Sequence, residues 1–152
     1  MKVKVKKLNK SAKIPFKNYH KDFCYDVVAT SCEEIAPNVY RYGIGLAFEI
    51  ERSREFLLDE GAREYLSIDF RPRSSVWKTG MILSNCVGTI DELYRGEVMA
   101  VFYHVMPNMP KYEIGDKIGQ IKLGVTEFIQ FVEVDDLSET ERGVNGYGST
   151  GK

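Results

Sequence analysis

The sequence predicts an all-β fold, either a sandwich or a barrel, on three observations. Hydrophobic residues recur with a period of two, the runs with this period are short and closely spaced, and turn-forming residues separate them. The chain has 152 residues, 43% of them hydrophobic, which suits a single domain with a core and is short for two domains. Charged residues make up 28% and nearly cancel, so the composition excludes a disordered chain.

The first strands follow from local alternation. Val3 and Val5 alternate with lysines, which predicts a strand with a solvated lysine face. From Tyr40 to Glu51, large apolar residues alternate with small or charged ones, as in a half-buried strand. Residues 66–71 repeat that pattern.

Later elements are predicted in the same way. Nearly every residue from Val98 to Val105 is apolar or aromatic, which predicts a strand covered on both faces. We expect another short strand at Phe128–Val134. Helical character is weak and confined to residues 53–65 and to the residues after Ser74-Ser75.

Lysines are concentrated at the N-terminus. Residues 1–21 carry eight of them and no acidic residue, whereas residues 22–152 carry 13 basic and 22 acidic side chains, a balance of −9. Such an arm could contact a nucleic acid or another polyanion. We favour the solvated strand and expect no specific nucleic-acid binding, because no set of aromatic residues for base stacking accompanies the lysines.

Membrane insertion and secretion are not expected. No stretch approaches the roughly 20 apolar residues of a membrane helix, and the lysine-rich start lacks the apolar core of a signal peptide. The three cysteines, Cys24, Cys32 and Cys86, are odd in number and contain no C-x-x-C pair, which argues against disulfides and against a zinc site. The sequence therefore predicts a cytoplasmic, reducing location.

Two segments have compositions that suit phosphate binding. Arg73-Ser74-Ser75 offers a guanidinium, two hydroxyls and the backbone N–H groups of a following turn, although an ordinary helix cap explains it equally well. Residues 142–151 combine an arginine with glycines, two hydroxyls and one aromatic ring, which suits a segment that folds over a polyphosphate. From composition alone, a flexible tail is the more economical explanation.

Two further segments offer groups for recognition and catalysis. Residues 85–98 predict a β-hairpin with a glycine turn, where Asp91 could activate a water and Tyr94 could border a sugar. Residues 115–120 predict a turn into a strand, with the amide of Gln120 available to a phosphate or a water. A surface acid beside a hairpin and a plain turn are the alternatives.

Together these segments resemble the five ordered motifs of trimeric dUTP pyrophosphatases (dUTPases). The resemblance covers about residues 22–152 and rests on residues 24–29, 72–76, 85–96, 115–120 and 142–151. It implies a jelly-roll-like β-barrel, the dUTPase-like β-clip, over residues 1–141, followed by a flexible lid at 142–152. It also implies a homotrimer with shared active sites that hydrolyses dUTP to dUMP and pyrophosphate, with Mg²⁺ as cofactor.

The resemblance assigns a role to individual residues. Asp91 matches the acid that activates the attacking water, and Tyr94 matches the ring that packs on deoxyribose and excludes a 2′-hydroxyl. Asp26 matches an acid that reaches Mg²⁺ through water, while the substrate phosphates mainly hold the ion. The set that contacts uracil and deoxyribose comprises Asn85, Gly88, Thr89, Tyr94, Met99 and the stacking ring of Tyr147. The phosphate-binding set comprises Arg73, Ser74, Ser75, Gln120, Arg142, Gly148, Ser149 and Thr150.

Two alternatives share this fold. A dCTP deaminase has a similar Arg-Ser-Ser motif but needs a glutamate at the base, and residues 88–96 fit a uracil-reading hairpin better. A regulatory protein would bind dUTP as a switch for a protein partner. Because Asp91 and Arg142 are both present, the resemblance favours catalysis.

Overall fold

The structure, a computed structural model, describes residues 2–52, 64–127 and 129–144. Within these ranges it contains ten β-strands, one 3₁₀ helix and no α-helix, so the all-β prediction is confirmed. The strands are β1 (Lys2–Lys7), β2 (Tyr25–Val28), β3 (Ser31–Ala36), β4 (Val39–Gly43), β5 (Leu46–Glu51), β6 (Glu64–Arg71), β7 (Met81–Leu83), β8 (Gly88–Asp91), β9 (Met99–His104) and β10 (Lys117–Glu127), and the 3₁₀ helix η1 spans Val76–Thr79.

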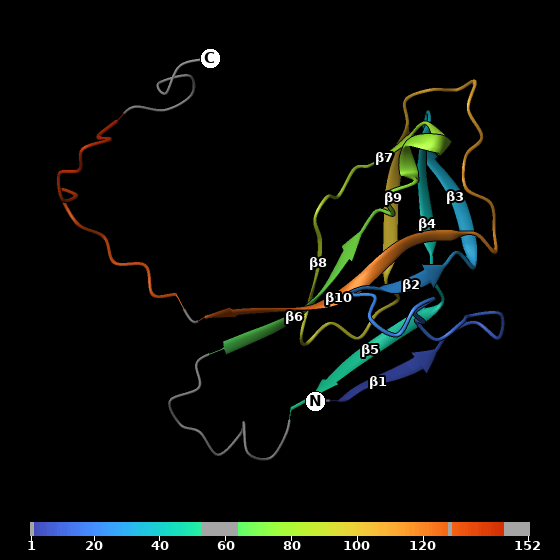
Figure 1. Cartoon of the computed structure of the whole chain (residues 1–152), viewed down its shortest axis with the longest axis horizontal. Coiled ribbons are helices and arrows are strands. Elements are labelled where there is room, and N and C mark those ends of the chain that lie inside the picture. Colours follow the sequence, from blue (N-terminus) through green and yellow to red (C-terminus); the bar gives the residue numbers. More distant parts are fainter. Residues whose placement is uncertain (1, 53–63, 128, 145–152) are drawn as a thin grey trace.

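The strands form three antiparallel sheets (Figure 1). The smallest joins β1 to β5, the second has the order β2-β10-β6-β8, and the third has the order β3-β4-β9-β7. Most neighbours within a sheet are far apart in the chain, because successive strands alternate between sheets. This connectivity is that of a jelly-roll-like barrel.

The hydrophobic core lies between the sheets. Its largest fully buried side chains include Tyr42, Phe70 and Phe102, one or more from each four-stranded sheet. The rings of Tyr42 and Phe102 meet edge to face with centroids 5.8 Å apart, a favoured arrangement for aromatic pairs. The alternation of hydrophobic residues in the sequence therefore corresponds to these inward-facing side chains.

The strand predicted over residues 40–51 is divided into β4 and β5. Gly45, between them, has a φ of +67°, which residues with a Cβ rarely adopt. A Cβ there would also lie 2.9 Å from Thr30 Oγ1 and 3.0 Å from Ala12 Cβ. This break lets the chain leave the third sheet and pair with β1.

The lysine-rich start of the chain forms the predicted strand. β1 pairs with β5 from Lys2↔Glu51 to Lys7↔Leu46, and its lysines are exposed. Lys4 Nζ lies 2.8 Å from Glu49 Oε1 across the pair. The solvated lysine face is therefore confirmed.

Two strand predictions are wrong in part. Residues 129–134 have no regular structure, and the strand of this region is β10, whose ladder with β6 ends at Glu127↔Glu64. The strand β9 is also not covered on both faces, since Ala100, Phe102 and His104 are buried while Met99 and Tyr103 are exposed. In both places the apolar run indicated a strand. It did not indicate whether another part of the chain would pair with that strand or cover its second face.

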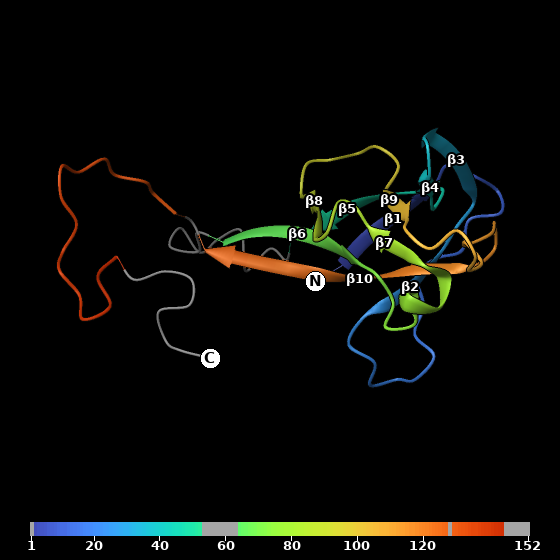
Figure 2. The same ribbon diagram turned by 90° about the horizontal axis from the view of Figure 1, so that it is seen from above.

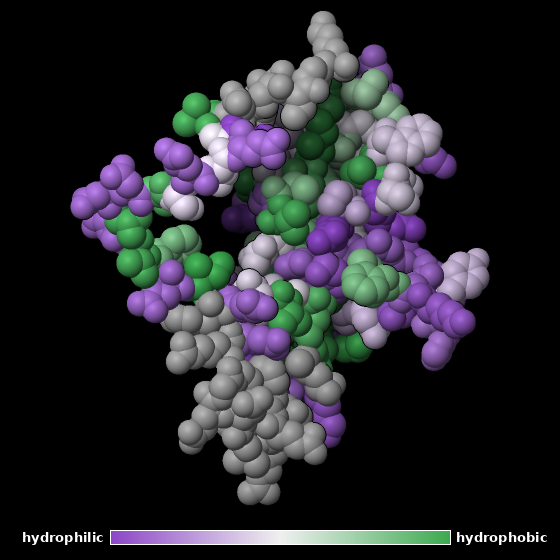
Figure 3. Space-filling model, turned by 60° about the vertical axis from the view of Figure 1, so that its left-hand side comes forward, coloured by the Kyte–Doolittle hydropathy of each residue, from purple (hydrophilic) through white to green (hydrophobic). Residues whose placement is uncertain are grey.

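The described chain continues beyond β10 as a C-terminal segment, residues 129–144. It leaves the sheets and extends away from them in both views (Figures 1 and 2). Phe131 is 91% exposed and Leu137 is 87% exposed. In Figure 3, hydrophobic and hydrophilic side chains are interspersed on the surface of this segment.

Two further predictions fall partly outside the described residues. Of the weakly helical stretch predicted at 53–65, residues 53–63 lie outside them, and the remaining two, Glu64 and Tyr65, belong to β6. The lid predicted at 142–152 lies outside them from residue 145 onward. The turn of helix predicted after Ser74-Ser75 is present as η1.

No helix of the described residues has the length and apolar character that a membrane crossing requires. Cys24, Cys32 and Cys86 are free thiols in the structure.

Candidate active site

A pocket of about 270 Å³ lies between the end of β8 and the start of β9. We call it the Asp91 pocket. It brings together six residues that the sequence assigned to substrate or catalysis, namely Asn85, Gly88, Thr89, Asp91, Tyr94 and Met99. Ile90, Glu97 and Val98 complete the lining and were not singled out by the sequence pattern.

Asp91 is the last residue of β8, an outer strand of its sheet. Its cross-strand neighbour on β6 is Ser67, and its side chain is exposed. The peptide oxygen of Asp91 accepts a hydrogen bond of 3.0 Å from the Tyr94 N–H, which closes the turn after the strand. Asp91 is therefore an exposed acid in the lining of the pocket.

The predicted hairpin over residues 85–98 is wrong as a two-stranded ladder. β8 pairs with β6, whereas β9 pairs with β4 and β7, so the two strands belong to different sheets. They still flank one pocket, because the turn between them spans the gap between the sheets. The predicted residues converge although the predicted pairing does not exist.

The ring of Tyr94 is held by the backbone of its own turn. Its hydroxyl donates a hydrogen bond of 3.2 Å to the Glu97 carbonyl. A Cβ at Gly96 would lie 2.3 Å from that hydroxyl oxygen, so the ring can occupy this position only because residue 96 is a glycine. Glu97 is in turn tied to the break between β4 and β5, since its Oε1 accepts a 2.7 Å hydrogen bond from the Gly45 N–H.

Asn85 has a fixed orientation at the other side of the pocket. Its Oδ1 accepts a hydrogen bond of 3.2 Å from the Val101 N–H on β9. The amide nitrogen then faces Gly88, where an added Cβ would lie 3.4 Å from Nδ2. The pocket thus presents an N–H donor next to the backbone of β8.

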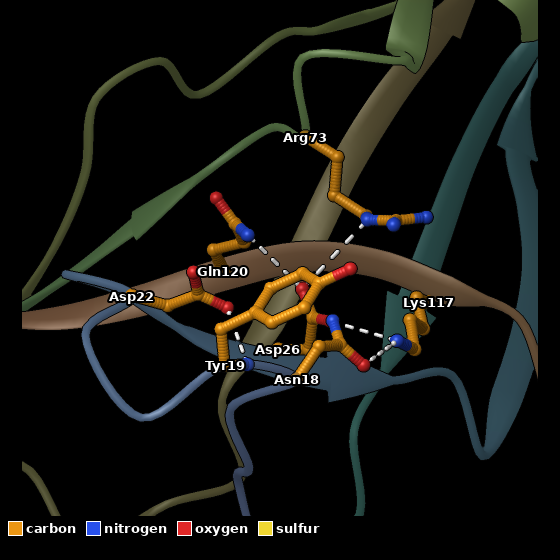
Figure 4. A network of polar contacts seen from close by, with 7 residues as sticks. All are labelled: Asn18, Tyr19, Asp22, Asp26, Arg73, Lys117 and Gln120. Atoms are coloured by element: carbon orange, nitrogen blue, oxygen red, sulfur yellow. Dashed lines mark hydrogen bonds and ion pairs between the residues drawn. The ribbon is translucent and has the colours of Figure 1, made fainter.

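A second group of polar residues surrounds Asp26, which is only 2% exposed (Figure 4). We call Asn18, Asp26, Arg73, Lys117 and Gln120 the Asp26 cluster. Asp26 Oδ2 lies 2.9 Å from Lys117 Nζ and accepts a 2.9 Å hydrogen bond from Asn18 Nδ2. Asp26 Oδ1 accepts a 3.1 Å hydrogen bond from Gln120 Nε2 and lies 3.7 Å from Arg73 Nε.

This environment keeps Asp26 ionised. Burial raises the pKa of the Asp26 carboxyl, but the hydrogen bonds from Lys117, Gln120 and Asn18 together outweigh burial and lower it below its ordinary value. Lys117 also donates a 2.9 Å hydrogen bond to Asn18 Oδ1. Two cations and two amides therefore share one buried anion.

The sequence predicted three members of this cluster and missed two. Asp26, Arg73 and Gln120 were assigned to the phosphates or to Mg²⁺. Lys117 belongs to the same motif as Gln120, so its charge next to a turn was the signal that could have revealed it. Asn18 carries no such signal, because a loop closed by the Tyr19 N–H and Asp22 Oδ2 places it over Asp26.

The other residues that the sequence assigned to phosphate binding do not belong to the Asp26 cluster. Ser75 occupies the N-cap position of η1, as the alternative of a helix cap expects, but its side chain makes no cap hydrogen bond. Ser74 is exposed beside it. Arg142 belongs to the C-terminal segment, which extends away from the sheets (Figure 1). The predictions for Tyr147, Gly148, Ser149 and Thr150 lie outside the described residues.

Both parts of the site occupy one face of the β2-β10-β6-β8 sheet. Side by side on that face are Asp26 and Gln120 in one row, Lys122, Asp69 and Thr89 in the next, and Gly124, Ser67 and Asp91 in the third. β2 and β8 are the two outer strands of this sheet, which puts them about 14 Å apart at ~4.8 Å per strand. The pocket and the cluster of one chain are therefore separate.

The donor set fits an anion rather than a bare metal ion. Among the described residues, no group of three or more His, Cys, Asp or Glu side chains could hold a metal. Both oxygens of Asp26 already face nitrogen donors. Mg²⁺ keeps several waters and is commonly held by substrate phosphates, so an ion that enters on a triphosphate suits this cationic site.

The fold and this divided polar site define a jelly-roll β-protein with an exposed acid at one sheet edge and, at the other, a cluster of two cations and two amides around a buried acid. A family model described as dUTPase matches residues 65–151. The deoxyuridine 5′-triphosphate nucleotidohydrolase of Nautilia profundicola is 34% identical over 154 residues, covering 100% of both chains. The chain belongs to the dUTPase family of hydrolases.

Other comparisons agree with this assignment. The nucleotidohydrolase of the same name from Zymomonas mobilis is 31% identical and covers 99% of this chain and 98% of its own. Among solved structures, a dUTPase of Staphylococcus bacteriophage 80alpha with dUpNHpp superimposes with a TM-score of 0.77 at 22% identity, over 99% of each chain. At that identity the superposition shows the shared fold.

Proposed function

We propose that this protein hydrolyses dUTP to dUMP and pyrophosphate with Asp91 as general base, thereby supplying dUMP and keeping uracil out of DNA. The observation that carries the proposal is the Asp91 pocket, which combines an exposed acid, a ring wall and an amide donor in one place. Membership of the dUTPase family supports the substrate. Asp91 takes a proton from water as the water attacks the α-phosphorus, and pyrophosphate leaves on the opposite side.

Base and sugar are selected by the walls of this pocket. The amide nitrogen of Asn85 is turned toward Gly88 and can donate to a carbonyl of uracil, where cytosine presents an amino group. Such a mismatch leaves buried polar groups unpaired, which discriminates strongly. The ring of Tyr94, fixed by the Glu97 carbonyl and by Gly96, blocks the space of a 2′-hydroxyl.

The Asp26 cluster binds the phosphates in this proposal. Lys117, Arg73 and Gln120 supply donors, and the hydroxyls of Ser74 and Ser75 lie in the adjoining turn. Asp26 acts as the internal counter-ion that orients them, rather than as a group that reaches Mg²⁺ through water. Mg²⁺ bound to the triphosphate neutralises charge that develops on the phosphates.

The active unit is proposed to be a homotrimer. The pocket and the cluster lie on opposite outer strands of one sheet, so a triphosphate held in one chain's pocket is proposed to meet the Asp26 cluster of another copy. The exposed Phe131 and Leu137 of the C-terminal segment offer apolar contacts to such a copy. Residues 142–152, with Arg142 and Tyr147, close over the nucleotide as a lid. The three free thiols are compatible with the reducing cytoplasm as its location.

The test is pyrophosphate release in the presence of Mg²⁺ from dUTP, dCTP, dTTP and UTP, measured side by side. We expect release from dUTP alone. Equal release from UTP would contradict the role of Tyr94, and ammonia from dCTP would indicate a deaminase. Tight dUTP binding without any release would point to a regulatory protein.

A further inference from the structure

The turn that follows Asp91 is attached to a neighbouring part of the sheet by an ion pair. Arg52 Nε donates a hydrogen bond of 2.6 Å to Glu92 Oε1, and Arg52 Nη2 donates to Glu92 Oε2, so the contact is bidentate (two-pronged). The same Nη2 donates to the Glu64 carbonyl at 3.0 Å. Arg52 therefore joins three segments: the residue after β5, the first residue of β6 and the residue after Asp91.

The pair is sheltered from solvent. The side chains of Arg52 and Glu92 are 18% and 21% exposed, compared with 57% and 45% for Lys4 and Glu49 in the ion pair on β1 and β5. Two-pronged arginine–carboxylate contacts are among the stronger charged hydrogen bonds and fix geometry as well as distance. The guanidinium also lowers the pKa of the Glu92 carboxyl, so both partners are charged at neutral pH.

The location of the pair gives it a functional meaning. β8 has only four residues, and within the described part of the chain it pairs on one side only, with β6. Asp91 is at its last position, where an outer strand without support frays most easily. Arg95 Nη1 adds a 2.6 Å hydrogen bond to the Glu92 carbonyl, so the residue beside Asp91 is held through its side chain and its backbone.

We propose that Arg52 and Glu92 are positioning residues that hold the Asp91 carboxylate where it meets the attacking water. This inference rests on the proposed role of Asp91 as general base. In this proposal, neither Arg52 nor Glu92 contacts the substrate. They act on the reaction by fixing the end of β8 and the turn to Tyr94, and misplacement of a catalytic group by about 1 Å can cost ~100-fold in rate.

The first test measures kcat, KM and the affinity for dUpNHpp in Arg52→Ala and Glu92→Gln. We expect kcat to fall by about 10-fold to 100-fold while dUpNHpp affinity changes less than about 3-fold, because positioning matters most in the transition state. Arg52→Lys keeps the charge but not the two-pronged contact and is expected to be intermediate. Arg41→Ala removes a more exposed arginine–glutamate pair, which joins β4 to Glu33 on β3 and lies outside the Asp91 turn, and is the control with unchanged kcat.

A double variant and an amide-exchange measurement complete the test. If Arg52 acts through Glu92, Arg52→Ala combined with Glu92→Gln is no slower than the slower single variant. Hydrogen exchange at the Tyr94 amide, which bonds the Asp91 carbonyl, should accelerate in Arg52→Ala, whereas the Ile44 amide, bonded to the Val98 carbonyl, should not change. Wild-type kcat and wild-type exchange at Tyr94, or additive losses in the double variant, would overturn the inference.

The exchange measurement also separates this inference from the proposed function. It requires no turnover, so it decides whether Arg52 holds the Asp91 turn even if the unmodified protein does not hydrolyse dUTP. Failure of the function would appear as no pyrophosphate release from the unmodified chain. Failure of the positioning inference would appear as release that Arg52→Ala leaves intact.

Discussion

Asp26 and Asp91 lie on the same face of one sheet but in opposite environments. Asp26 is buried and its two oxygens face four nitrogen groups, whereas Asp91 is exposed at the end of an outer strand. A carboxylate whose oxygens are all engaged cannot readily accept a proton from water. An exposed carboxylate beside a pocket can, so the two acids suit different tasks.

Asp91→Asn should separate binding from chemistry. The amide keeps the size of the side chain but cannot take up a proton, so we expect turnover to fall by at least about 100-fold, within the range for general-base catalysis. Isothermal titration with dUpNHpp should give an affinity close to that of the unmodified protein. Full activity in the variant would remove Asp91 from the mechanism.

Asp26→Asn should destabilise the fold in a pH-dependent manner. The pKa of Asp26 is lowered in the folded state, so its carboxylate stabilises the fold above the ordinary pKa of 3.8, and this contribution is lost as the pH falls through the folded pKa. Loss of charged hydrogen bonds costs about 1–3 kcal/mol, so the variant should unfold at a lower urea concentration at pH 7. The difference should begin to narrow as the pH falls below about 4 and should close once the pH is below the folded pKa.

The exposed Glu49, paired with Lys4, provides the control for that experiment. Its pKa is also lowered, chiefly by the hydrogen bond from Lys4, but the pair is solvated. Exposed ion pairs contribute little, so Glu49→Gln should unfold like the unmodified protein at every pH. Equal curves for Asp26→Asn and the unmodified chain at pH 7 would contradict the assignment of Asp26 as a stabilised buried anion.

At the scale of elements, alternation revealed strands whose inner face is buried and whose outer face is polar. It located β6 through Leu66, Ile68 and Phe70, which are all buried. It did not reveal the extent of β10, because Gly119 and Gly124 interrupt its pattern. Their absent side chains are required by neighbours on β6: a Cβ would lie 2.2 Å from Phe70 Cζ at the first and 2.4 Å from Ser67 Oγ at the second.

The residues that line the Asp91 pocket were predicted better than the strand pairing that brings them together. Six residues of the Asp91 pocket were recognised by their order in the chain, which motif resemblance preserves. The pairing of β8 with β6 was not, because strand partners depend on contacts between residues distant in sequence. Glu97 and Asn18 were missed for the same reason, since their partners, Gly45 and Asp26, lie outside their own motifs.

Gly119→Ala tests the close approach of β10 to the Phe70 ring. The ring is 1% exposed and cannot move aside, so the added methyl group should destabilise the fold by about 1–3 kcal/mol, as overpacked cores do. Thermal unfolding monitored by circular dichroism would measure the loss. Gly88→Ala is the matched control, since its Cβ would lie 3.4 Å from Phe70 Cβ, an ordinary contact, and should leave the melting temperature nearly unchanged.

At the scale of the whole molecule, the C-terminal segment is the part that the sequence misread. Phe128–Val134 has the composition of a strand, but the strand β6 that pairs with β10 begins only at Glu64, opposite Glu127. Beyond that point the described residues contain no strand paired with the segment. Its exposed apolar residues are the reason to expect a partner from a second copy of the chain.

Phe131→Ser combined with Leu137→Ser should weaken assembly. These side chains are 91% and 87% exposed, so the change should not disturb the core of one chain but should remove apolar area from an interface. Light scattering over a range of concentrations should show the variant dissociating at concentrations where the unmodified chain stays trimeric.

Deletion of residues 142–152 is the comparison for that variant. It removes the proposed lid and leaves Phe131 and Leu137, so we expect a trimer that does not hydrolyse dUTP. A monomer after this deletion would place the assembly contacts in the lid itself. An unmodified chain that is monomeric at all concentrations would contradict the trimer.

In the proposed function, the buried carboxylate of Asp26 also affects how the phosphate anion is bound. Lys117 and Arg73 are long side chains, and immobilising either one costs about 1.5–2 kcal/mol of rotamer freedom. Asp26 holds both before any ligand arrives, so this ordering takes place when the chain folds and is not subtracted from the binding energy. The three groups together carry a single positive charge. In the proposed function, phosphate recognition at this position is therefore the binding of an anion to groups whose arrangement is already fixed.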